Sequence, residues 1–221
     1  MLGDVVKGAP AGEVMKVRVS GTIVRSTMIA LVILCGQREA AAQDERFEVG
    51  AQAATAVSGE FDATDVGIGA RFAWRPTGVF GLEGEFDVYP QEFPDTGVAI
   101  SGGRVEALVG VTVGPQLGRI RPFVRIRPGV LRFQEAPAPV PCILIFPPPL
   151  GCSLAAGETM FALDVGGGVE VQMTPRTLLR VDVGDRLVRY PGPAFDSNRE
   201  VHDDDFFGHD VRVAVGAGVR F

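Results

Sequence analysis

The chain has little positive charge, almost no lysine and no long hydrophobic run. Its 21 Lys and Arg are outnumbered by 27 Asp and Glu, which gives a formal net charge of -6. Nucleic acid is excluded as a partner, because binding its phosphates requires clustered Lys and Arg. No stretch approaches the roughly 18 to 20 consecutive apolar residues that cross a bilayer as a helix, so a helical membrane protein is excluded as well.

The residues that are abundant favour strands over helices. The chain is 46% hydrophobic and 22% charged, which excludes a disordered or fibrous protein. It has 29 Gly and 16 Pro among many Val and Phe, a mixture that suits strands joined by turns. The composition therefore favours an all-β fold.

Residues 15–42 have the pattern of a secretory signal peptide. Three basic residues come first: Lys16, Arg18 and Arg25. A short apolar run follows at 28–35, and the alanines at 40–42 supply the small residues that signal peptidase requires. We expect cleavage between Ala42 and Gln43, with 43–221 as the mature domain.

Two alternatives concern this leader. Residues 1–14 lack signal character, so translation starts either at Met1 or at Met15, with 1–14 then an extension of the gene model. A lipoprotein signal at Cys35 is the less favoured alternative, because the preceding residue is Leu34 rather than a small one.

Eight segments of the mature region alternate apolar and polar residues, the pattern of strands with two unlike faces. In chain order they are 47–54, 66–74, 80–88, 104–113, 120–130, 161–172, 179–184 and 211–221. Pro122 and Pro128 make the fifth segment the least regular. Apolar residues do not recur at helical spacing, so we expect no helices.

The connections between these segments alternate in length. Long ones at 58–64, 90–102, 134–158 and 190–209 are separated by short ones at 76–78, 114–119 and 174–176. An up-and-down barrel places alternate connections at opposite rims, and strands of about ten residues cross the bilayer when tilted. The sequence thus predicts an eight-stranded antiparallel up-and-down transmembrane β-barrel.

The period does not say which face points inward, since a soluble barrel has the same alternation. The polar face combines small residues with balanced acids and arginines, which fits the crowded interior of an eight-stranded barrel. We therefore predict an ion-paired interior and an apolar, lipid-facing exterior. The interior candidates are Arg71, Glu83, Glu85, Arg104, Glu106, Arg125, Arg127, Asp164, Glu170, Arg180, Asp182 and Arg212. Expected members of an interfacial aromatic girdle are Phe72, Trp74, Phe80, Tyr89 and Phe221.

Together these features resemble the small outer-membrane β-barrels of Gram-negative bacteria, the OmpA/OmpX-like group. The alternating end of the chain at 216–221 carries the resemblance most strongly, and segments 121–124, 166–170 and 179–182 are similar to the outer membrane protein beta-barrel domain. The resemblance implies that Phe221 is part of the signal read by the outer-membrane assembly machinery. It also implies localisation in the outer membrane.

Three other features of the mature region suggest chemistry. Cys142 and Cys152 lie in one loop of an exported chain, so we expect a disulfide. His202 and His209 lie near Asp203, Asp204, Asp205 and Asp210, and this group is either a metal site or, as we favour, a solvated acidic loop. The apolar stretch between the cysteines either binds a partner or, as we favour, packs over the barrel mouth.

We therefore expect an integral outer-membrane barrel with a structural or surface-interaction role. It is not expected to be a wide pore or an enzyme, and it needs no cofactor and no metal. Its expected partners are outer-membrane lipid, the assembly machinery and, through the long loops, a surface partner. The alternatives are a secreted soluble β-barrel that binds a small apolar ligand and, third, an outer-membrane lipid-modifying enzyme.

The first prediction concerns the mature end of the chain. Protein recovered from the membrane fraction should begin at Gln43, because Ala40 and Ala42 supply the small cleavage-site residues. N-terminal sequencing measures this directly. A chain that begins at Met1 would contradict export, and one that begins at Cys35 would be a lipoprotein.

Overall fold

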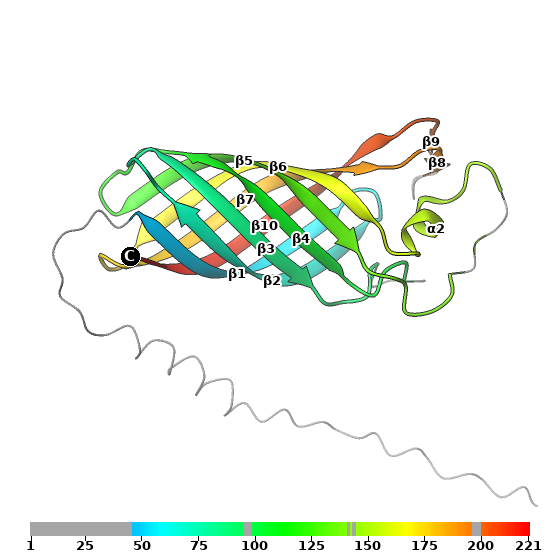
Figure 1. Ribbon diagram of the computed structural model, residues 1–221, viewed down its shortest axis with the longest axis horizontal. Helices are drawn as coiled ribbons and strands as arrows, with labels where there is room; N and C mark the ends of the chain where they lie inside the picture. Colours follow the sequence, from blue (N-terminus) through cyan, green and yellow to red (C-terminus); the bar gives the residue numbers. More distant parts are fainter. Residues whose placement is uncertain (1–45, 95–98, 141, 143–144, 196–199) are drawn as a thin grey trace, which may run out of the picture. The chain divides into compact units, whose positions relative to one another are not determined.

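The computed structural model describes residues 46–94, 99–140, 142, 145–195 and 200–221, and these form a closed β-barrel (Figure 1). The predicted signal peptide and its cleavage site lie outside the described residues. No helix within the described ranges is long and apolar enough to cross a membrane.

Eight long strands build the barrel. They are β1 (Phe47–Ser58), β2 (Ala63–Trp74), β3 (Phe80–Tyr89), β4 (Arg104–Val113), β5 (Ile120–Phe133), β6 (Thr159–Gln172), β7 (Thr177–Tyr190) and β10 (Phe206–Arg220). Each pairs antiparallel with the next along the chain, and β1 pairs with β10 to close the barrel. The predicted fold and strand number are confirmed.

Several strands are longer than the sequence pattern indicated. The seventh was expected at 179–184 but spans 177–190, and the last begins at 206 instead of 211. Alternation continues into these extensions, but the outward-facing residues there include Asp185, Arg189 and His209, so the contrast between an apolar and a polar face is lost. The difference in polarity between the two faces of a strand therefore ends several residues before the strand itself.

Three short elements interrupt the long connections. They are the helix α2 (Leu150–Leu154) and the two strands of a small hairpin, β8 (Ala194–Phe195) and β9 (Val201–His202). The expectation of no helices is wrong at α2, a single turn whose Leu150 and Leu154 are buried. So short an element offers too few residues for a helical period to be seen.

The two ends of the barrel differ. We call the end with the connections 75–79, 114–119 and 173–176 the turn rim, and it also holds residues 46 and 221. The opposite end, the loop rim, has the connections 59–62, 90–103, 134–158 and 191–205. The first connection was expected to be long, but it is a tight turn in which Asp62 has a positive φ of 46°. Strict alternation of long and short connections therefore fails there.

Local side chains explain the tight turns at the turn rim. The hydroxyl of Thr77 accepts a hydrogen bond from the Phe80 N–H at 2.9 Å, and the hydroxyl of Thr174 accepts one from the Thr177 N–H at 3.0 Å. Gly118 has a φ of +64°, a conformation that favours glycine. These bonds reverse the chain within a few residues.

The fifth strand is continuous despite its two prolines. β5 pairs with β4 on both sides of a gap in which 109–110 lie opposite 127–128. Pro128 has no N–H to donate, which accounts for an interruption at this point. The neighbouring pair β5–β6 keeps one register along its length, so the hairpin geometry is regular.

The outer face of the barrel is apolar and the inner face is polar, as predicted. Outward side chains such as Ile68 and Val109 are 68% and 64% exposed, whereas their polar neighbours are buried. Phe72, Trp74, Phe80 and Phe221 point outward near the turn rim. Tyr89 does not belong to this girdle. The odd-numbered residues of β3 point inward, and Tyr89 is fully buried among them.

The second prediction tests the outward direction of this face. Val109→Arg places a charge in the middle of the apolar surface and should destabilise the barrel by roughly 2–4 kcal/mol and impair assembly. Val201→Arg is the matched control, since Val201 is also exposed but lies in β9, outside the barrel wall. Heat-modifiable migration after refolding into detergent measures the folded fraction. Equal folding of the two variants would contradict a lipid-facing surface.

Candidate functional site

The interior of the barrel is filled by a network of ion pairs. All twelve interior candidates from the sequence are buried, and each one pairs with an oppositely charged side chain. Among the described residues, ten buried carboxylates belong to it: Glu48, Asp65, Glu83, Glu85, Asp87, Glu106, Asp164, Glu170, Asp182 and Asp210. Ten arginines complement them: the buried Arg71, Arg104, Arg121, Arg125, Arg127, Arg180, Arg186 and Arg212, with Arg75 and Arg220 at the turn rim. The network is therefore neutral overall.

The centre of the network lies around Arg127 on β5. Its guanidinium contacts Glu83 at 3.0 Å, Glu85 at 2.5 Å and Asp164 at 2.8 Å, and so connects β3 with β6 across the interior. Arg125 also pairs with Asp164, at 2.7 Å. One guanidinium can serve several carboxylates because its five donors form a planar fork.

Toward the turn rim the network continues through Arg180 on β7. This side chain contacts Glu83 at 2.8 Å and Asp182 at 2.7 Å, and Asp182 also pairs with Arg125. The Arg180 guanidinium lies 4.1 Å from the centre of the Phe123 ring, which adds a cation–π contact. Charged and aromatic side chains thus share the narrow interior.

Toward the loop rim the pairs form two linked groups. Arg212 contacts Asp87 at 2.7 Å, while Arg186 contacts Glu106 at 2.7 Å and Asp210 at 2.5 Å. Tyr89 joins the groups, because its hydroxyl donates to Glu106 at 3.2 Å and lies 3.4 Å from the Arg212 Nε. The inward turn of Tyr89 therefore places a polar contact inside the barrel.

The candidates from the sequence omitted six fully or almost fully buried members of the network. Glu48, Asp87 and Arg121 lie within the predicted segments, and the other three are Asp65, Arg186 and Asp210. These last three lie in strand extensions beyond the predicted segments. Asp210 was assigned to the acidic loop, but it occupies an inward position on β10 and pairs with Arg186. Continuing the period of two through the charged outward residues would have placed these last three inside.

A glycine makes room for part of this network. Gly69 on β2 lies opposite Asp87 on β3, and a Cβ at Gly69 would collide with the Asp87 carboxylate. The absence of a side chain lets Asp87 reach both Arg212 and the Gln52 amide, which donates to it at 2.9 Å. The glycines on the inner face therefore accommodate the long charged side chains.

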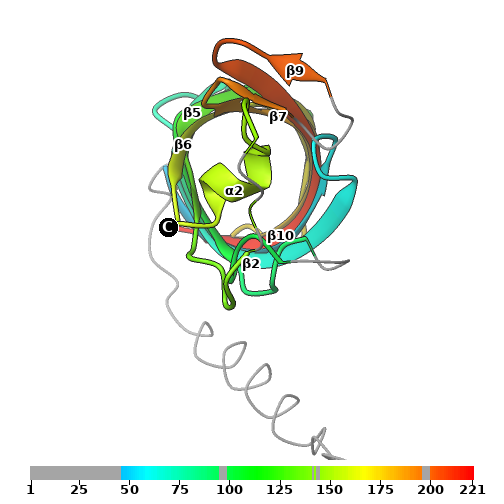
Figure 2. The same ribbon diagram turned by 90° about the vertical axis from the view of Figure 1, so that its right-hand side faces the viewer.

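An apolar cluster closes the loop rim. It includes Phe93, Phe133, Leu150, Leu154 and Tyr190, all almost completely buried. Figure 2, which views the barrel from this end, shows α2 lying across the mouth. Because apolar side chains follow directly on the ion pairs, the described residues leave no wide aqueous path through this end.

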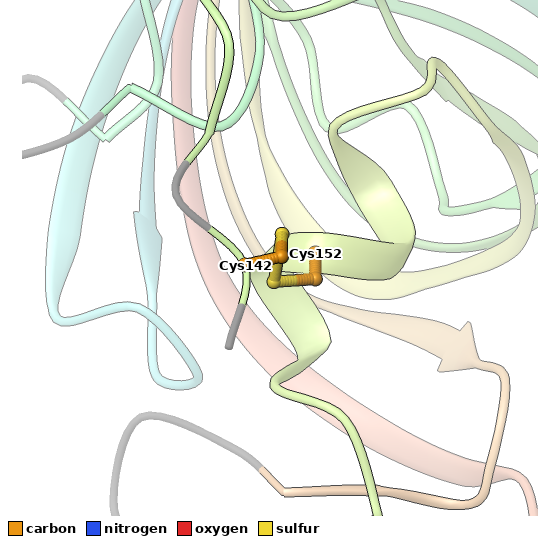
Figure 3. The surroundings of a disulfide bond; sticks show 2 residues. All are labelled: Cys142 and Cys152. Atoms are coloured by element: carbon orange, nitrogen blue, oxygen red, sulfur yellow. A yellow bond between two sulfur atoms is a disulfide. The ribbon is translucent and has the colours of Figure 1, made fainter. Parts of the chain in front are cut away.

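The two cysteines of the long loop are joined. The structure places Cys142 and Cys152 in a disulfide with their Cα atoms 5.8 Å apart (Figure 3). Within the described part of this loop, Leu150 and Leu154 pack into the barrel mouth, whereas Ile145 and Phe146 are exposed by 47% and 86%. The favoured expectation of packing thus holds for α2, while the tip of the loop faces outward.

The two histidines have different neighbours. His202 stacks on Phe206 with ring centres 3.7 Å apart, and His209 lies on the outer face of β10, 2.8 Å from Asp185. Among the described residues no group of three or more His, Cys, Asp or Glu is arranged to hold a metal ion. The Gly192 N–H and the Arg189 guanidinium bond to Asp205 and hold the pKa of that carboxyl below its usual value.

Phe221 lies where the barrel closes. Its N–H donates to the Phe47 carbonyl at 2.9 Å, and the Phe47 N–H donates back at 3.1 Å. Their rings stack with centres 6.2 Å apart, and the Phe221 side chain is exposed on the outer face. The end of the chain is thus paired through its backbone while its ring remains accessible.

Several solved structures resemble this barrel. The structure of Neisserial surface protein A matches with a TM-score of 0.50 and 15% identity over 79% of this chain and 97% of that one. The chain has the fold of a small outer-membrane β-barrel. Two further matches come from Pseudomonas aeruginosa: the N-terminal barrel domain of OprF (TM-score 0.47, 11% identity, 79% and 97% covered) and OprG (0.45, 14%, 80% and 95%). No family model and no curated protein matches the sequence.

The third prediction tests the ion pairs. Arg127→Gln leaves Glu83, Glu85 and Asp164 short of a buried partner, and should destabilise this barrel by roughly 3–5 kcal/mol where the site is dry. Arg132→Gln is the matched control, because Arg132 lies on the same strand but is exposed. Urea unfolding in detergent, followed by tryptophan fluorescence, measures both.

A second substitution separates charge from packing. Adding Glu85→Gln to Arg127→Gln restores neutrality, so the double variant should be more stable than the sum of the two single effects predicts. Equal stability of Arg127→Gln and Arg132→Gln would contradict a buried network.

Proposed function

We propose that this chain is an integral, non-enzymatic protein of the outer membrane with a structural or surface-interaction role. One observation supports the proposal most strongly: an apolar exterior surrounds an ion-paired interior in a closed barrel. Lipid offers no partner for an open strand edge or for an unpaired charge, and this arrangement leaves neither exposed. The outer-membrane lipid is then the first partner of the chain.

The same observation opposes transport as the function. The interior holds ten carboxylates and their arginines, and an apolar cluster lies at the loop rim. A barrel of eight strands is narrow enough for side chains to fill it. We therefore propose that the barrel anchors its loops and does not conduct solutes as a wide pore.

The alternative of a soluble barrel with an apolar ligand inside fits less well. Such a protein needs an apolar cavity, whereas the residues described inside this barrel are charged over most of its length. Its outward valines and phenylalanines would also face water. A lipid-modifying enzyme has no particular observation in its favour.

Two further partners are part of the proposal. The C-terminal strand β10, with the exposed ring of Phe221, is suited to recognition by the outer-membrane assembly machinery before the barrel closes. The long loops are suited to a surface partner, and the exposed Ile145 and Phe146 are the apolar side chains that such a partner would contact.

The fourth prediction tests localisation and assembly together. The full chain, expressed in a Gram-negative host, should be found in the outer-membrane fraction as a heat-modifiable species. Phe221→Ala should lower the assembled amount severalfold, because it removes the terminal ring. Phe146→Ala, which removes an even more exposed ring from a loop, should assemble like the wild type.

Two results would contradict this proposal. A wild-type protein recovered from the soluble periplasmic fraction would exclude an integral membrane barrel. Equal assembly of Phe221→Ala and the wild type would exclude a role for the terminal ring.

A further inference from the structure

A pocket of about 280 Å³ opens at the turn rim, away from the sealed loop rim. Four arginines contribute to its lining, Arg46, Arg75, Arg121 and Arg220, and no acidic residue does so. Its volume is near the lower limit, roughly 300 Å³, of pockets that hold small ligands. An all-arginine set of charged lining residues selects for anions.

The arginines that line this pocket share a small number of carboxylates. Glu48 and Glu170 pair with three of the lining arginines, Arg75, Arg121 and Arg220. Glu48 is shared by Arg71, Arg75 and Arg220, at 2.6, 2.9 and 3.2 Å. Glu170 is shared by Arg75, Arg220 and Arg121, at 2.6, 3.0 and 3.5 Å. Glu170 also contacts Arg180 at 3.4 Å, so two carboxylates serve five arginines.

Some N–H donors of these arginines have no acceptor, or only a neutral one, within the protein. The Nε of Arg75 is buried without a hydrogen-bond partner, and the side chain is about nine-tenths buried. Arg121 donates to two backbone carbonyls, those of Gly114 at 3.1 Å and Val79 at 3.3 Å, and its contact with Glu170 is long. Neutral carbonyls are weaker acceptors for a guanidinium than an anion is.

Closure of the barrel fixes the backbone from which these side chains extend. Arg220 ends β10 and Arg46 precedes β1, and the two strands pair along their length. The Arg46 carbonyl accepts a bond from the Arg75 N–H at 2.7 Å, which fixes the turn 75–79 beside them. A set of donors held by backbone pairing binds an anion with little loss of conformational freedom.

We propose that this pocket binds a phosphate group. The guanidinium fork matches phosphate oxygens bidentately, and several forks converge on one small space here. With the short turns on the periplasmic side, the group comes either from a soluble phosphate compound or from the headgroup of an inner-leaflet phospholipid. Only this choice of sources depends on the proposed function, since the binding site itself belongs to the folded barrel.

The test uses the full mature barrel, refolded in an uncharged glucoside detergent at low salt. Two probes are titrated by calorimetry: inorganic pyrophosphate for the soluble source, and short-chain phosphatidylglycerol mixed into the micelles for the lipid source. We expect saturable binding of at least one probe at one site per chain. Binding of pyrophosphate supports the soluble source, and binding of the lipid alone supports the headgroup.

Three variants locate the site. Arg46→Gln and Arg75→Gln should each weaken binding about tenfold or more, because each removes a charged donor from the pocket. Arg119→Gln removes the same charge from an exposed position of the same rim that does not line the pocket, so its affinity should stay within about twofold of wild type. Heat-modifiable migration checks that each variant is folded. Of the two pocket substitutions, Arg46→Gln should disturb the barrel less, because Arg46 precedes β1.

The proposal is overturned if neither probe binds saturably to the folded wild type. It is equally overturned if Arg119→Gln weakens binding as much as Arg46→Gln, since the effect would then be the charge of the rim as a whole. Failure of binding with normal folding in detergent would leave the membrane barrel itself intact, so the two proposals fail separately.

Discussion

Charge balance inside a sleeve surrounded by lipid is the constraint on which the rest of this structure depends. Removing an ion from water costs several kcal/mol even after relaxation, so each interior charge needs an opposite partner. Ten arginines complement ten buried carboxylates among the described residues, and no lysine follows residue 16 in the sequence. Arginine suits this task because one guanidinium, such as that of Arg127, can pair with three carboxylates from two strands.

The interior charges balance over the whole barrel, but they are arranged differently at its two ends. At the loop rim the network ends beneath apolar side chains, where the Arg104 guanidinium lies 3.9 Å from the centre of the Phe93 ring. At the turn rim Glu48 and Glu170 are each shared by several arginines, and four arginines line an open pocket. The interior is therefore closed toward the long loops and accessible from the turn rim. This asymmetry fits a barrel that anchors loops outside and presents positive charge inside the cell envelope.

Alternation in the sequence was sufficient to predict eight strands, their order and the inward direction of all twelve charged candidates. It failed where the outward face turns polar, so Arg186 and Asp210 were left outside the predicted strands although they pair inside. It also missed Tyr89, because an aromatic at a strand end suits either face. The arginine pocket was not predictable from spacing, since Arg46 and Arg220 lie about 170 residues apart in the sequence and meet only when β1 pairs with β10.

The most direct test of this account is the solvent accessibility of successive positions along β4 in a bilayer. Single cysteines at 105 to 112, each carrying a spin label, report collisions with dissolved oxygen and with a water-soluble nickel reagent. The odd positions should collide with oxygen and the even ones with neither, because Ala107, Val109 and Val111 face lipid while Glu106 and Leu108 are buried. Loss of this period of two, or nickel collisions at 107 and 109, would contradict an ion-paired interior within a lipid-facing wall.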